Sequence, residues 1–334
     1  MPNPFQVDPS RTTMIRRRFV ADIHRRMKVL EKKNRELIVD DDVFGLNDPQ
    51  SFTILQQVPK QAWRFLSDAQ KVATYRVWLQ EQIDLDLLTV DAIDPTKPWT
   101  ATYVESAYQK GVVRSYIDVH KQDLATKGAA FYQGGMEQFL LDAFAAPQLL
   151  NTVELLYMRS FTELKGVTDV MSQQMSRILA EGFVNGHGPA KIAREMRKQI
   201  STLTKRRADL IAHTEVIRAH AEGQLDSLRM LGIDEVGLLV EWSTAGDDRV
   251  CPLCGDLDGV VLTIDEATGL IPRHPRCRCS WAPTSKAIRE RDQKRGGAAL
   301  KAVRESIKSE GPKTIKRTFK ETKDRSAWAG KELL

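Results

Sequence analysis

The chain has 334 residues, of which 42% are hydrophobic, and a formal net charge of +6. This length exceeds that of one small domain and predicts two or three domains with sizeable apolar cores. No apolar run approaches the roughly 18 residues that a bilayer-crossing helix needs, so we expect no membrane-spanning segment.

The positive charge is concentrated at the two ends of the sequence. Residues 1–40 hold ten Lys or Arg against five Asp or Glu, and residues 284–334 hold fifteen against seven, which leaves a net −7 between them. Basic ends around an acidic middle are typical of contacts with a polyanion or an acidic protein surface, although solvated surface charge gives the same pattern.

Helical periodicity begins near the amino terminus. Asp8-Pro9 reads as an N-cap followed by proline, and the apolar residues that follow recur at steps of three and four, which predicts a basic amphipathic helix over residues 9–38. Its outer face carries arginines that are candidates for contact with DNA or with a protein partner, namely Arg16, Arg17, Arg18, Arg25 and Arg26.

Further helices are expected along the first two thirds of the chain. Ser67 to Gln70 resembles a capping box, which predicts a helix from there to about residue 88. The pattern predicts others over 100–127, 134–145, 147–165, 167–183, 189–199 and 205–231. Extended segments are expected at 236–242, 260–263 and 279–281, and the lysine-rich residues after about 285 predict weak helices or disorder.

The last long helix carries polar residues that we expect to be buried. Thr214 and Glu215 are predicted to make hydrogen bonds and an ion pair that dock this helix onto the β-rich module. A metal or catalytic role for His213 and His220, which share one helix face, is the alternative.

All four cysteines lie within a short stretch that has the spacing of a zinc site. Cys251 and Cys254 form a Cys-x-x-Cys pair, and His274 and Cys277 repeat that frame. Such turns aim ligands at one ion about 2.3 Å from each sulfur. Tetrahedral zinc takes four ligands, so we favour these four residues, with Cys279 as the substitute for His274.

Two other uses of the cysteines are possible. Two disulfides are disfavoured because the chain opens with polar residues and an arginine run instead of a signal peptide. A catalytic zinc would need an open position and a carboxylate base, whereas the aspartates around Cys251 are more simply turn residues. We therefore expect one closed, structural Zn²⁺ site.

Over about residues 150–285, the chain resembles the phage Mu F-like minor head protein family, also called phage head morphogenesis proteins, in several sequence motifs and in their order. These motifs are Ile211–Glu215, Glu241–Thr244, Asp247–Cys254, Leu257–Gly259 and His274–Cys279. One departure is that the family usually has an arginine where this chain has His213.

The resemblance implies a minor capsid protein of a tailed bacteriophage or prophage, without enzymatic activity, that assists head assembly and DNA packaging or delivery. Implied partners are the portal protein, major capsid or scaffold proteins, and packaged double-stranded DNA bound without sequence preference, with no membrane partner. The implied location is the capsid interior near the portal vertex of the virion, after assembly in the host cytoplasm. Alternatives are a zinc-ribbon DNA-binding protein, or a zinc-dependent hydrolase or nuclease with Glu215 or Asp248 as base.

The predicted fold is mainly α. An extended helical region over 1–150 would make the portal, capsid or DNA contacts. A small zinc-stapled α+β domain over 151–285 would form the Mu F-like domain, followed by a basic, partly disordered tail over 286–334. The zinc clip is expected because the β-rich module is too short to bury a large core.

Overall fold

The computed structural model describes residues 8–47, 63–121, 132, 134–232 and 239–285, together with residues 294, 297, 298 and 301. Apart from those last four positions, the expected basic tail over 286–334 lies outside the described residues.

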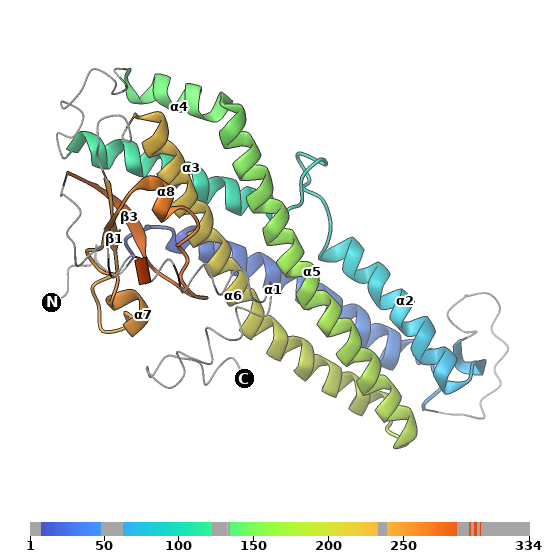
Figure 1. The fold of residues 1–334 in the computed structure, drawn as a ribbon. Coiled ribbons are helices and arrows are strands. Elements are labelled where there is room, and N and C mark those ends of the chain that lie inside the picture. Colours follow the sequence, from blue (N-terminus) through green and yellow to red (C-terminus); the bar gives the residue numbers. More distant parts are fainter. Residues whose placement is uncertain are drawn as a thin grey trace. The chain divides into compact units, whose positions relative to one another are not determined.

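The described chain is mostly helical, with one small sheet (Figure 1). The long helices are α1 (Thr13–Arg35, continued by a π-helical turn, η1, over Glu36–Asp40), α2 (Asp68–Asp86), α3 (Ala101–Lys121), α4 (Met136–Ala145), α5 (Pro147–Val184) and α6 (Pro189–Met230). Two single turns, α7 (Pro252–Gly255) and α8 (Ile264–Ala267), accompany three strands, β1 (Leu239–Ser243), β2 (Val261–Leu262) and β3 (Ser280–Thr284). The strands pair antiparallel in the order β2-β1-β3. The predicted fold class is confirmed.

The starts of α1 and α2 show how side chains set helix ends. The predicted start of α1 at Pro9 was wrong, because Arg11 has a positive φ of 53° and Asp8 Oδ2 accepts a hydrogen bond from the Thr13 backbone N at 3.0 Å. Asp8 thus caps a helix that begins four residues later than predicted. The capping box of α2 is confirmed, since Ser67 and Gln70 exchange hydrogen bonds between side chain and backbone.

Two predicted helix breaks do not occur. The predicted helices over 147–165 and 167–183 form the single helix α5, and those over 189–199 and 205–231 form α6. Gly166 is exposed, and a glycine inside a helix lowers its stability by only about 1 kcal/mol relative to alanine. The Thr204 hydroxyl donates to the Ile200 carbonyl within α6 at 2.7 Å, so it does not compete for backbone groups outside the helix.

The chain forms two compact units. Unit 1 contains the described parts of Met1–Arg18, Thr100–Ser160 and Leu210–Leu334, and unit 2 those of Phe19–Trp99 and Phe161–Asp209. Helices α1, α5 and α6 each contribute to both, so the units are built from stretches that are distant in sequence. The division into consecutive regions at residues 150 and 285 stays a prediction.

The core of unit 2 is formed by α1, α2 and the portions of α5 and α6 that belong to it. Tyr75 is fully buried, and its hydroxyl donates to the Asn34 side chain on α1 at 2.5 Å. Phe44 packs edge-on against Phe183 at the end of α5, with ring centroids 5.4 Å apart. Buried methionines of α5 and α6 complete this core, including Met171, Met175 and Met196.

The core of unit 1 joins α3 and the second half of α6 to the sheet. A Cβ built on Gly111 of α3 would lie 2.1 Å from the His220 carbonyl oxygen, and one on Gly223 of α6 would lie 2.3 Å from that of Tyr108. The two helices therefore touch backbone to backbone at these glycines. Within the sheet, Trp242 of β1 and Trp281 of β3 lie opposite each other and form a T-shaped pair with ring centroids 5.2 Å apart.

Among the described residues, no single helix is long and apolar enough to cross a membrane. Helices α4 and α5 meet the length and composition criteria only when taken together, and they are bent by 66° at their junction.

Candidate metal centre

The first pair of candidate ligands is held by a tight turn. Cys251 precedes the single turn α7, and its carbonyl oxygen accepts hydrogen bonds from the backbone N of Cys254 at 3.1 Å and of Gly255 at 2.8 Å. Both cysteines are buried, at 2% and 3% exposure. The turn brings their two thiols to the same buried spot.

The second pair lies in the turn that precedes β3. The Cys277 backbone N donates to the His274 carbonyl at 3.1 Å, and Arg276 between them adopts a left-handed φ of 61°. A non-glycine residue in this region carries a conformational cost, which the contacts of the turn have to offset. Cys279 follows two residues later, directly before the strand.

The two turns converge on one cluster. His274 Nε2 lies 3.1 Å from the Sγ atoms of both Cys251 and Cys254, and Cys254 Sγ lies 3.9 Å from Cys277 Sγ. Cys254 belongs to two groups with metal-binding spacing, one with Cys251 and His274 and one with Cys277 and Cys279. All five candidates are thus brought together, and the described cluster is compatible with one bound metal ion.

The thiols are not disulfide-bonded. All four cysteines are free and buried, and the 3.9 Å between the sulfurs of Cys254 and Cys277 is far above the about 2.05 Å of an S–S bond. The hydrogen bond with Cys254 lowers the pKa of the Cys251 thiol to about 5. A thiol that readily becomes a thiolate suits metal ligation.

The orientation of His274 is fixed by the backbone. Its Nδ1–H donates to the Pro275 carbonyl at 2.7 Å, which leaves the Nε2 lone pair facing the thiols. Metal-ligating histidines usually donate their second ring N–H in this way. His274 therefore has the arrangement of a ligand, and the present geometry keeps Cys279 as a candidate beside it.

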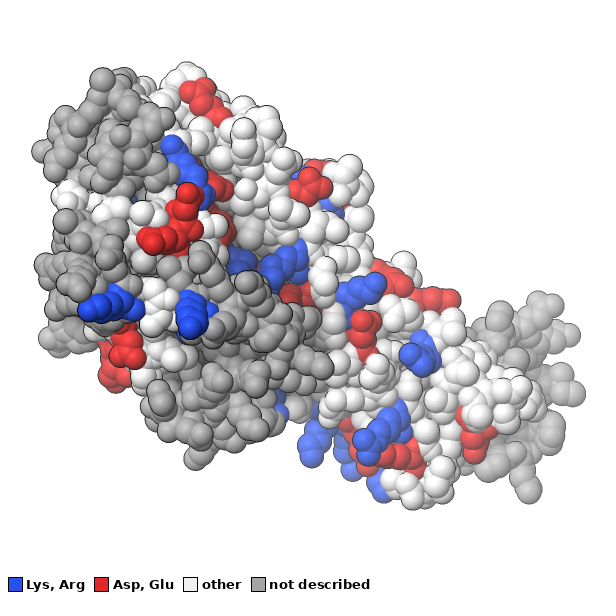
Figure 2. All heavy atoms as spheres, viewed as in Figure 1, with Lys and Arg blue, Asp and Glu red and all other residues white. Residues whose placement is uncertain are grey.

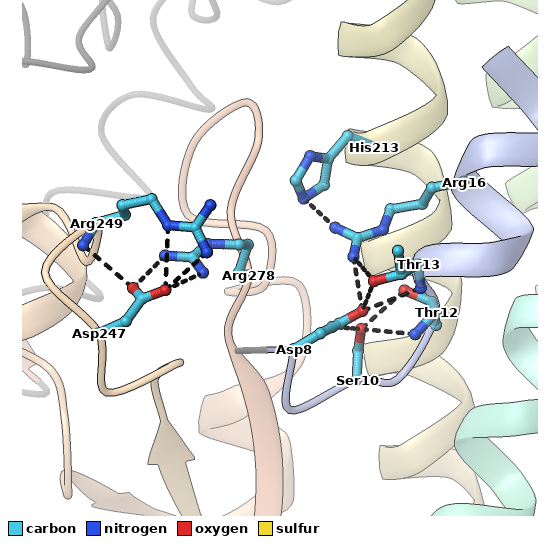
Figure 3. Close-up of polar contacts among 9 residues, drawn as sticks. All are labelled: Asp8, Ser10, Thr12, Thr13, Arg16, His213, Asp247, Arg249 and Arg278. Atoms are coloured by element: carbon cyan, nitrogen blue, oxygen red, sulfur yellow. Dashed lines mark hydrogen bonds and ion pairs between the residues drawn. The ribbon is translucent and has the colours of Figure 1, made fainter. Parts of the chain in front are cut away.

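An acidic residue links the two ligand segments. Asp247 receives two hydrogen bonds from Arg278, at 2.5 and 2.7 Å, and further ones from Arg249 (Figure 3). The hydrogen bonds from Arg278 hold the pKa of the Asp247 carboxyl well below its usual range. Since Arg278 lies between Cys277 and Cys279, this bidentate pair ties the loop before Cys251 to the second ligand turn.

His213 lies beside this region and contacts the first turn of α1. Arg16 Nη1 donates to His213 Nε2 at 2.6 Å, and Arg16 Nη2 donates to Asp8 at 2.6 Å (Figure 3). Burial and the neighbouring Arg16 lower the pKa of His213 to about 3, so the ring is neutral at physiological pH. The hydrogen bonds of Arg16 therefore connect His213 on α6 with Asp8 ahead of α1.

The arginines predicted on α1 fall into two groups. Arg16 is 12% exposed and ion-paired, and Arg26 donates to the Asp86 carbonyl at 2.7 Å while lying over the Trp99 ring at 4.3 Å. Internal contacts therefore hold these two side chains. Arg17, Arg18 and Arg25 are exposed, and their contact with a partner stays a prediction.

The residues predicted to dock α6 are buried. Glu215 is 3% exposed and forms ion pairs with Arg159 of α5 at 3.4 Å and with Arg218 at 3.8 Å. Thr214 is 8% exposed. Their predicted role in docking onto the β-rich module stays a prediction, whereas the described contact of Glu215 with Arg159 joins α6 to α5.

Sequence reasoning missed Gln224, which joins α6 to the sheet. Its amide donates to the Trp281 carbonyl at 2.8 Å, and its Oε1 accepts from the Trp281 backbone N at 3.1 Å and from the Ser280 hydroxyl at 2.9 Å. A glutamine in a helix gives little signal of such a role, because its two partner residues in the sheet lie more than fifty residues away in sequence.

Residues 173–282 match the model of a protein family described as "Phage Mu protein F like protein". The match includes all five candidate metal ligands, the sheet through Ala282 and the whole of α6. No curated protein and no solved structure matches the chain significantly.

Proposed function

Because residues 173–282 match the model of the Phage Mu protein F-like family, we propose that the chain is a minor capsid protein of a tailed bacteriophage or prophage that binds the portal inside the head. In this role it assists head assembly and the packaging or delivery of DNA. Its partners are the portal, neighbouring capsid or scaffold proteins and packaged DNA. The family match is the observation that carries this proposal.

We further propose that the cysteine cluster holds one structural Zn²⁺. Thiolates with an imidazole at this spacing are the ligands that zinc prefers. The β-rich module also has only short strands, which by themselves stabilise its fold little. Buried ligands and a second turn held by Asp247 favour a closed site. Bound zinc would contribute directly to the folding of the module.

A hydrolytic zinc would need a base near the cluster. Glu215 is buried and ion-paired with Arg159 and Arg218, and Asp248 is exposed. Neither residue is among those that line the pocket beside Cys251, Cys254 and His274. These placements favour the structural role over catalysis.

The test of the head role is co-purification with the portal protein of the same phage. The chain, co-expressed with tagged portal rings, is expected to elute with the rings in a fixed ratio, and purified virions should contain it. Chain that never accompanies the portal and is missing from virions would refute the proposal.

The test of the metal is native mass spectrometry with elemental analysis, comparing wild type with Cys254→Ser. Cys254 is chosen because it is shared by both groups of ligands. We expect one zinc per chain in the wild type and none in the variant, with Ser176→Ala, an exchange outside the cluster, as the control that keeps its zinc. Wild-type protein purified under reducing conditions without zinc would contradict the site.

A further inference from the structure

A basic groove lies on unit 2 between α1 and the first half of α6. It has a volume of about 600 Å³, and its lining includes the small residues Ala190 and Ala193. The groove and an adjoining hollow are lined by six basic side chains, namely Lys28, Lys32, Arg35, Arg194, Arg197 and Lys198. Their lining includes two carboxylates, Glu31 and Glu195. In Figure 2, blue side chains with a few red ones gather where Figure 1 draws the first half of α6.

The spacing of the basic residues follows from helix geometry. Lys28, Lys32 and Arg35 are separated by four and three residues, which places them on one face of α1. Arg194, Arg197 and Lys198 occupy neighbouring positions on one face of α6. At about 1.5 Å of rise per residue, the α1 row extends over about 10 Å. The two rows flank the same groove.

In the ion pairs that three of these side chains make within the protein, the basic side chain is largely exposed. Arg197 lies 4.0 Å from Glu31 and is 64% exposed, and Lys32 lies 3.4 Å from Glu36 and is 75% exposed. Arg35 lies 3.2 Å from Asp40 and is 65% exposed. Exposed pairs contribute at most about 1 kcal/mol, so an incoming polyanion can displace them.

We propose that this groove binds the sugar-phosphate backbone of double-stranded DNA without reading its sequence. The proposal rests on the proposed function, because a head protein at the portal meets packaged DNA. Lysine and arginine neutralise phosphates and release counterions, and this binding carries no sequence information. The small side chains of Ala190 and Ala193 in the lining leave room for the sugar-phosphate backbone.

The chemistry of the lining favours duplex over single-stranded nucleic acid. Sites for single strands combine positive charge with aromatic platforms for the bases. The side chains described as lining the groove include no aromatic residue and no Asn or Gln that would read a base edge. A lining of charged and small side chains therefore suits contacts with the phosphates of a duplex.

The experiment measures the affinity of the full chain for a random-sequence DNA duplex by fluorescence anisotropy over a salt series. The test variant is Lys28→Ala with Arg194→Ala and Lys198→Ala. The control variant removes the same charge from exposed helical positions of unit 2 outside the groove, as Arg76→Ala with Lys165→Ala and Arg177→Ala. Alanine favours helices, so both variants should fold, which circular dichroism checks.

We expect the groove variant to bind at least tenfold more weakly at about 0.1 M salt, with the salt slope reduced by about 2 to 3, because each phosphate contact contributes about 0.9. The control should bind like wild type, and Lys28→Arg with Lys198→Arg should retain affinity. An equal loss in both alanine variants, or a marked preference for one DNA sequence, would overturn the proposal.

Failure of this inference is distinguishable from failure of the proposed function. A chain that binds portal rings but no DNA would refute the groove and leave the head role standing. DNA binding that depends on the groove, in a chain that binds no portal, would support the groove and contradict the head role.

Discussion

At the residue scale, several side chains have contacts that connect distant parts of unit 1. Asp8 caps α1 and pairs with Arg16, which in turn donates to His213. Asp247 holds Arg278 between two candidate ligands. Each of these polar groups is largely buried. Removing one of them would therefore reduce the free energy of unfolding, because its partner would be left without a hydrogen bond.

Gln224→Ala is expected to destabilise unit 1 by about 3 kcal/mol, because it leaves the buried polar groups of Trp281 and Ser280 without their partner. Chemical denaturation followed by tryptophan fluorescence measures the change. The matched control is Gln138→Ala on α4, whose amide donates to Asp142 at 2.8 Å at the surface. The control should change stability by less than about 0.5 kcal/mol. Similar losses in both variants would contradict the role assigned to Gln224.

At the element scale, the contact between α3 and α6 depends on two glycines. The backbones meet where Gly111 faces His220 and Gly223 faces Tyr108. Any side chain at either position would force these helices apart, because the obstructing atoms belong to the backbone and cannot move as a flexible side chain would.

Gly111→Ala should therefore destabilise unit 1 by at least about 2 kcal/mol, since the new Cβ would meet the His220 carbonyl. Gly166→Ala on α5 is the control, because a Cβ there meets nothing within 4 Å. Its higher helix propensity predicts a gain of up to about 1 kcal/mol. Thermal and denaturant unfolding give both values, and a Gly111 variant as stable as wild type would exclude the close approach.

At the scale of the whole molecule, the two units differ in what stabilises them. Unit 2 has a core of long helices, with Tyr75, Leu79 and Ile83 fully buried. The β-rich module of unit 1 has strands of only five, two and five residues around the cysteine cluster. A bound metal would therefore contribute much of the stability of so small a module.

Removal of metal by a chelator is expected to unfold residues 239–285 while the helices of unit 2 stay folded. Hydrogen exchange followed by mass spectrometry should show lost protection in the strands and the two ligand turns. Peptides from α2 serve as the internal control and should keep their protection. Uniform loss over the whole chain, or no change in the strands, would contradict a structural metal confined to this module.

The sequence by itself determined the features that depend on local spacing. Apolar periodicity predicted the long helices, and Ser67 with Gln70 predicted the start of α2, because both signals act within a few residues. The spacing within each pair, Cys251 with Cys254 and His274 with Cys277, predicted the ligands for the same reason, whereas the meeting of the two pairs depends on the fold. Only the tertiary structure showed that α5 and α6 are each continuous where the sequence predicted a break. It also decided the burial of Arg16, the contacts of Gln224 and the pairing of α1 with α6 along the basic groove. These features depend on partners far away in sequence, and packing, which acts through space, selects them.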